Sequence, residues 1–152
     1  MDQFERKRRN ESLAKFLGWY QEKDEPYTWY KKGEFAISVA FSTYNSTFKE
    51  LPFANDFNYI LKVLEALRTR DSSIRKPHQI TIERLELSLE HIAIKLLEWK
   101  DGHLIPGKKM DLILYSIGKG FDSLHEMYFV GLSDCAEIIN TLNETHETEL
   151  VK

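Results

Sequence analysis

The sequence predicts an α+β protein, a layered sandwich in which a small antiparallel sheet packs against a central amphipathic helix and a C-terminal helix. Three observations predict this class. Apolar residues recur at helical spacing between residues 51 and 70, alternate with polar residues between 81 and 99, and return to helical spacing after residue 123.

Length and composition favour one globular domain. The 152 residues are 42% hydrophobic, which is enough for a core, so we expect one domain over residues 1–152 with flexible ends at 1–10 and 145–152. The formal net charge of −3 provides no global positive field for nucleic acid. The single cysteine, Cys135, and the lack of a signal peptide predict a cytoplasmic protein. The longest uncharged run, residues 35–48, is too short and too polar to span a membrane.

The central helix over residues 51–70 is the clearest element. Pro52 suits its first turn, and Asp56 favours its positive N-terminal end. We expect the apolar stripe to dock on a β-layer. The stripe consists of Phe53, Phe57, Ile60, Leu61, Leu64 and Leu67.

The N-terminal segment carries four consecutive basic residues, Arg6 to Arg9, with acidic residues nearby. We interpret this run as a solvated, partly frayed helix start, and a phosphate-binding arm is the alternative. Asn10 is the expected N-cap of a short helix that ends before Gly18.

Residues 19–44 are rich in aromatic side chains. Such rings either fill the space between a helix and a sheet or form a platform on which bases or sugars stack. Residues 27–31 are a candidate strand of a hairpin, and residues 34–43 are a second strand or an irregular loop. Three aromatic residues of this segment are candidate binding residues: Trp19, Trp29 and Tyr30.

Residues 81–99 fit two structures. Apolar residues at spacings of three and four predict a helix, but a helix would place Leu87 and Ile94 among charged residues on its wet face. We therefore favour two strands with a bulge or turn near residue 90. Asp101 and Gly102 then form a hairpin-type turn pair.

Residues 110–117 predict a short buried strand, and a long helix is expected after Ser123. Ser123 and Glu126 have the spacing of a capping box. Gly131 costs about 1 kcal/mol relative to alanine within a helix, so a strand over residues 127–130 followed by a shorter helix is the alternative.

Three segments share a packing pattern: residues 13–19 with a Gly-Trp exit, residues 51–65 with a Leu-Pro-Phe entry, and residues 123–143. Together they resemble small proteins encoded by phages and prophage-like elements, similar to the phage α-β-α sandwich domain. That group commonly has a tryptophan where this chain has Phe57, and residues 74–120 have no counterpart. The resemblance implies a three-layer fold and a mobile-element origin, and it implies no activity.

The sequence contains no catalytic, metal-binding or cofactor signature, and its five histidines have no metal-ligand spacing. We therefore expect no catalytic residue, metal or cofactor. An enzyme would need several polar side chains to converge in one pocket. The candidates are His91, His103, His125, Glu90 and Asp111.

These observations favour a non-enzymatic accessory protein that binds a protein partner or forms a homo-oligomer. The alternative is a nucleic-acid-binding protein that uses local basic patches and exposed aromatic rings. Its basic residues would lie at the end of the central helix and in the following loop, where they could also cap the helix and solvate the loop. These residues are Arg68, Arg70, Arg75 and Lys76.

Overall fold

The computed structural model describes residues 1–21, 28–31, 34–38, 41–42, 47–48, 50–69, 78–105, 112–118 and 120–151. Its helices are α1 (Gln3–Phe16), η1 (Pro52–Ala54), α2 (Phe57–Arg68) and α3 (Leu124–Val151). Its strands are β1 (Trp19–Tyr20), β2 (Thr28–Lys31), β3 (Glu34–Ser38), β4 (Phe41–Ser42), β5 (Thr47–Phe48), β6 (His78–Leu87), β7 (His91–Lys100), β8 (His103–Leu104) and β9 (Leu112–Ser116). The predicted α+β class is confirmed.

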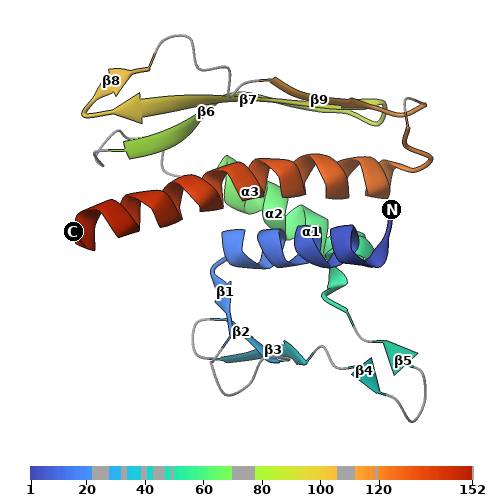
Figure 1. Cartoon of the computed structure of the whole chain (residues 1–152). Coiled ribbons are helices and arrows are strands. Elements are labelled where there is room, and N and C mark those ends of the chain that lie inside the picture. Colours follow the sequence, from blue (N-terminus) through green and yellow to red (C-terminus); the bar gives the residue numbers. More distant parts are fainter. Residues whose placement is uncertain are drawn as a thin grey trace.

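The elements form layers (Figure 1). A sheet of β6, β7, β8 and β9 forms one outer layer, and α3 lies across its inner face. The helices α1 and α2 follow, and the small sheet of β1, β2 and β3 lies on their far side. Helix α2 packs against η1 and α3, so α3 joins the helical layer to the large sheet.

The large sheet is organised around β7. Strand β6 pairs with β7 antiparallel along its length, while β9 and β8 pair with successive parts of its other edge. The favoured assignment of residues 81–99 to two strands is therefore confirmed, and the chain turns between Leu87 and His91. A bulge at Glu83 shifts the register. Strand pairing places Leu87 and Ile94 on the sheet face where Ile92 is buried, which a helix could not do.

The β7–β8 turn has the predicted geometry. Asp101 and Gly102 have φ angles of 50° and 80°, the positive values that a two-residue type I′ hairpin turn requires. The strand expected near residues 110–117 is also present as β9. It lies at the edge of the sheet rather than in its centre, so the expectation that it is buried fails at Leu114, which is 57% exposed.

Helix α2 begins later than predicted. Asp56 is its N-cap, accepting a hydrogen bond from the Asn58 backbone N–H at 3.0 Å, and Pro52 belongs to the separate turn η1. The prediction that Leu61 faces inward is wrong, because its side chain is 49% exposed. The buried face is centred on Ile60 and its helical neighbours, and Leu61 lies at the edge of that face. The buried residues are Ile60, Val63, Leu64 and Leu67.

Helix α1 begins at Gln3, so the prediction that Asn10 is an N-cap is wrong. Asp2 caps the helix instead, since its carboxylate accepts a hydrogen bond from the Glu5 backbone N–H at 2.8 Å. Asn10 lies inside the helix and is 1% exposed. The two ends expected to be flexible, residues 1–10 and 145–152, are largely helical: residues 3–10 belong to α1 and residues 145–151 belong to α3.

Helix α3 is continuous across residues 127–130, so the alternative strand there is wrong. Its first turn is capped by Ser123, whose hydroxyl accepts a hydrogen bond from the Glu126 backbone N–H at 3.1 Å. A packing contact explains why position 131 is a glycine. A Cβ at this position would lie 3.0 Å from Cδ2 of Tyr115, so glycine lets the Tyr115 ring rest on the helix.

Candidate functional site

The two candidate tryptophans belong to the core. Trp19 is 6% exposed and Trp29 is 2% exposed. The Trp19 ring centroid lies 5.4 Å from that of Phe53 and 6.1 Å from that of Tyr59, so it joins β1 to η1 and α2. These two indoles therefore present no open ring face on which a base or sugar could stack.

The third aromatic candidate, Tyr30, is half-buried and stacks on Tyr20, with ring centroids 5.8 Å apart and an interplanar angle of 28°. The β1–β2 register pairs these two residues directly. Tyr20 is 38% exposed, so it presents the accessible ring of the pair. The sequence did not single out Tyr20, because only the strand register shows that the two rings meet.

The basic run contains one buried guanidinium, that of Arg9. Its Nη1 donates hydrogen bonds to Asp134 Oδ1 at 2.6 Å, to Ser133 Oγ at 2.9 Å and to the Val130 carbonyl at 3.1 Å. Glu5 accepts from its other nitrogen atoms. Burial alone would lower the pKa of Arg9, but hydrogen bonds to the two carboxylates outweigh burial and raise it, so the side chain stays charged.

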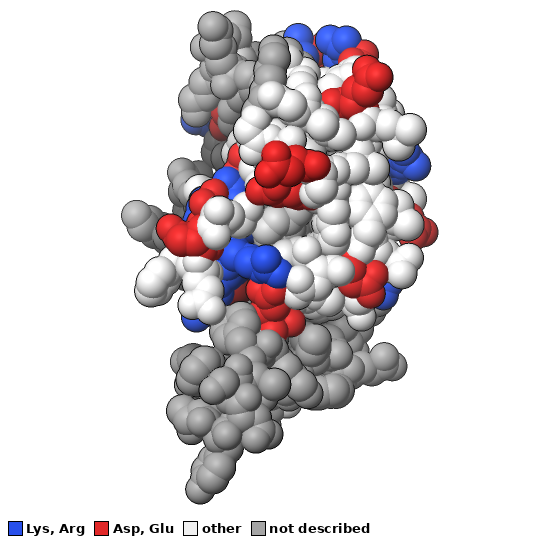
Figure 2. All heavy atoms as spheres, turned by 90° about the vertical axis from the view of Figure 1, so that its right-hand side faces the viewer, with Lys and Arg blue, Asp and Glu red and all other residues white. Residues whose placement is uncertain are grey.

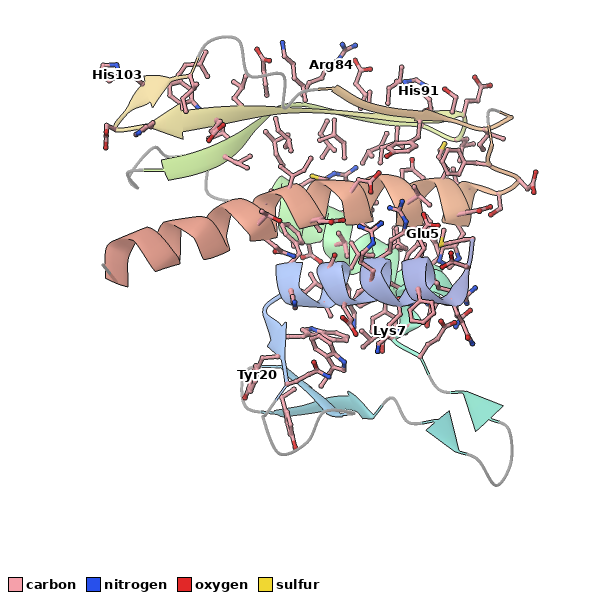
Figure 3. All side chains as sticks on the ribbon, in the orientation of Figure 1. Glu5, Lys7, Tyr20, Arg84, His91 and His103 are labelled. Atoms are coloured by element: carbon pink, nitrogen blue, oxygen red, sulfur yellow. The ribbon has the colours of Figure 1, made fainter. Side chains whose placement is uncertain are left out.

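The neighbouring arginines are paired as well. Arg6 donates to Glu50 and to Asn55, and Arg8 pairs with Glu137 on α3. Figure 3 shows Glu5 on the side of α1 that faces α3 and Lys7 on the opposite side. The arginines of this run hold α1 against its neighbours, so a phosphate-binding arm would have to displace carboxylates that already neutralise them.

The Arg9 cluster continues into the large sheet through Tyr115 of β9. The Tyr115 hydroxyl donates a hydrogen bond to Asp134, whose other oxygen binds Arg9. Burial, followed by this hydrogen bond, raises the pKa of Tyr115 above its ordinary value. Asp134 thereby connects α1, α3 and β9.

The second group of basic candidates lies at the end of the central helix and in the loop that follows it. The structure describes one member of this group, Arg68. It is the last residue of α2 and is exposed. Arg70, Arg75 and Lys76 lie outside the described residues. The described part of the chain therefore shows one exposed cation of the four.

The outer face of the large sheet, which points away from α3, carries exposed apolar side chains at both ends. At one end, Trp99 pairs with Leu104, which is 45% exposed. At the other end, Leu114 is 57% exposed. Leu89 and Ile117 flank this second end and are 77% and 40% exposed, and the Ile117 N–H bonds the carbonyl of Glu90 in the same turn.

Charged side chains occupy the middle of the outer face and pair with one another. Arg84 lies 2.5 Å from Glu86, and Lys95 lies 2.9 Å from Glu83. The hydrogen bond from Arg84 holds the pKa of Glu86 below its ordinary value. Figure 3 shows Arg84, His91 and His103 on this side of the sheet. The middle is therefore ionic but balanced in charge.

A pocket of about 350 Å³ opens at the end of the molecule where α1 and α3 begin. Of the residues that an enzyme would need to bring together, His125 lines this pocket, whereas Glu90 and His91 lie at the β6–β7 turn and His103 lies on β8. Asp111 lies outside the described residues. The described candidates therefore do not converge, and the described residues contain no group of three His, Cys, Asp or Glu side chains placed to hold a metal ion.

Within the part of the chain that the structure describes, no helix is both apolar and long enough to pass through a membrane. No protein-family model, curated protein or solved structure matches the chain. Its function must therefore be inferred from its own residues and surfaces.

Proposed function

We propose that this chain is a non-enzymatic accessory protein of a phage or mobile element. It acts in the cytoplasm as a self-associating module, and the outer face of the large sheet is its interface. One observation carries the proposal: no described element covers this face, which exposes apolar side chains at both ends. A cluster of exposed apolar side chains, such as Leu89, Leu114 and Ile117 at one end of this face, is typical of protein interfaces.

The charge pattern of the outer face favours a second copy as the partner. Two cations, Arg84 and Lys95, lie beside two anions, Glu83 and Glu86. A face that is neutral overall has no single sign of charge with which to select an oppositely charged partner. In a two-fold dimer each surface meets its own copy, so a balanced ionic centre between two apolar ends can be complementary to itself.

Sedimentation equilibrium over a series of concentrations tests this proposal. The wild-type protein should form dimers, and Leu114→Lys should dissociate them, because it places an unpaired charge in the apolar part of the interface. Leu61→Lys is the matched control, since Leu61 is similarly exposed but lies on α2. This variant should dimerise like the wild type.

Two results would contradict self-association through this face. One is a wild-type protein that stays monomeric at about 0.1 mM, a concentration at which even a weak specific interface is populated. The other is a dimer that Leu114→Lys and Leu61→Lys weaken equally. If the protein is a strict monomer, the partner at this face would have to be a different protein.

Nucleic-acid binding is the alternative function. Exposed Arg68 and the accessible ring of Tyr20 support it, while the pairing of the arginines in α1 counts against it. Binding of single-stranded DNA at about 50 mM salt, with an affinity that falls steeply as salt rises, would favour this alternative. Absence of binding at that salt concentration would exclude it.

A further inference from the structure

The pocket where α1, η1 and α3 meet is a second candidate site, separate from the outer face of the sheet. Its volume of about 350 Å³ lies within the range of small-ligand sites. Figure 2 faces this end of the molecule and shows cations and anions interspersed. The pocket is lined by Met1, Arg6, Ala54, Ser123, His125, Glu126 and Phe129.

Glu126 provides a carboxylate in this pocket that no described side chain neutralises. In a complete capping box, the Glu126 side chain would turn back to accept from the Ser123 backbone N–H. The structure contains the other half of the box, in which the Glu126 N–H donates to Ser123 Oγ, but not this reciprocal bond. No Lys, Arg or His side chain of the described residues forms an ion pair with Glu126.

Arg6, whose side chain is the cationic one that lines the pocket, is already neutralised. Its Nε donates to Glu50 at 2.8 Å, and its Nη2 donates to Asn55 at 2.5 Å. An anionic ligand would therefore compete with Glu50 and would also face the unpaired charge of Glu126. The side-chain charges of the pocket therefore disfavour an anion.

A hydrogen bond to η1 holds the His125 ring in place. Its Nε2 lies 2.8 Å from the carbonyl oxygen of Phe53, and because a carbonyl oxygen can only accept, Nε2 carries the proton. The pocket thus combines the Glu126 carboxylate with an apolar wall to which Ala54 and Phe129 contribute.

We propose that this pocket binds an organic cation, a primary ammonium or guanidinium group on a short alkyl chain. Glu126 is its counter-ion, and the apolar wall packs against the chain. The same chemistry occurs in a free alkylamine and in the side chain of a lysine or arginine of another protein. The proposal does not depend on self-association through the sheet.

Backbone amide resonances followed by NMR during titration test this site. Butylammonium and butylguanidinium should shift the resonances of residues 123–129 and of Ala54 until saturation, whereas butanol and butyrate should not. Capped tripeptides with a central lysine or arginine then distinguish the two sources: tighter binding than butylammonium indicates a protein side chain, and weaker binding indicates a free small amine.

Glu126→Gln should weaken binding of butylammonium by about tenfold or more, because it removes the charge that the cation meets. Glu65→Gln is the matched control, since Glu65 is exposed on α2 and its substitution changes the net charge equally. A circular dichroism melt confirms that each variant is folded. The site would be disproved by non-saturable shifts with both cations, by unchanged binding in Glu126→Gln, or by equal losses in the two variants.

Discussion

Helices α1 and α2 are held in the fold by different forces. The buried face of α2 is an apolar stripe of Ile60, Val63, Leu64 and Leu67. The buried residues of α1 include Arg9, Asn10 and Ser12, and the helix contacts α3 through hydrogen bonds and ion pairs. Apolar burial has a period that is visible in the sequence, whereas ion pairing depends on partners elsewhere in the chain. This difference explains why the sequence predicts α2 as a core helix but predicts a partly frayed start for the first half of α1.

The largest expected effect on stability comes from the apolar buried face of α2. Ile60→Ala should lower the free energy of unfolding by about 2–5 kcal/mol, because Ile60 is fully buried and its truncation leaves a cavity. Leu61→Ala, at the exposed edge of the same helix, should change it by less than about 0.5 kcal/mol. Urea denaturation measures both values. Equal effects would mean that the buried face of α2 is not the one described.

The second largest expected effect on stability comes from the ion pairs that hold α1. Arg9→Met should lower the free energy of unfolding by about 2–3 kcal/mol, because it leaves Asp134 without its buried cation while keeping an apolar stem. This is less than for a fully enclosed pair, since Asp134 is partly exposed. Lys7→Met removes a 4.0 Å surface pair and should cost at most about 0.5 kcal/mol. If both substitutions cost the same in urea denaturation, ion pairing does not hold α1.

A smaller effect tests the contact between α3 and the sheet. Gly131→Ala would stabilise an isolated helix by about 1 kcal/mol, but here the new Cβ meets the Tyr115 ring at 3.0 Å. We expect the substitution to bring no gain in the wild type and to stabilise the protein in a Tyr115→Ala background. A double-mutant cycle measures the coupling, and additive effects would show that the ring does not rest on Gly131.

The smallest expected effect near neutral pH is the contribution of the Tyr115 hydroxyl to the free energy of unfolding. Because the pKa of Tyr115 is raised in the folded state, its contribution to stability is fully present below about pH 10 and is lost as the pH rises further. Burial raises the pKa of Tyr128 as well. Unfolding free energies measured between pH 8 and pH 11, a range of about three units around the ordinary tyrosine pKa, should fall more steeply in the wild type than in Tyr115→Phe. Parallel curves would contradict the buried hydrogen bond to Asp134.

The candidate sites show the same division between what was predictable and what was not. Aromatic density predicted rings between a helix and a sheet or a stacking platform, and the burial of Trp19 and Trp29 agrees with the first interpretation. Acidic residues near the basic run predict a solvated helix start, because they dilute its charge, but Arg6 and Arg8 pair with carboxylates that are distant in the sequence. Arg8 and Glu137 are 129 residues apart. The pocket could not be predicted, since residues from α1, η1 and α3 meet there.

Local periodicity and local backbone preferences were enough to predict the α+β class, the core helix α2 and the turn at Asp101 and Gly102, and they favoured two long strands over a helix at residues 81–99. Packing between distant segments sets which charges are neutralised, which sheet face stays open and where the unpaired carboxylate of Glu126 lies. Arg9 and Asp134 illustrate the reason: they are 125 residues apart, and only the packing of α1 beside α3 brings them to 2.6 Å. Electrostatic complementarity between distant segments leaves no periodic pattern along the chain.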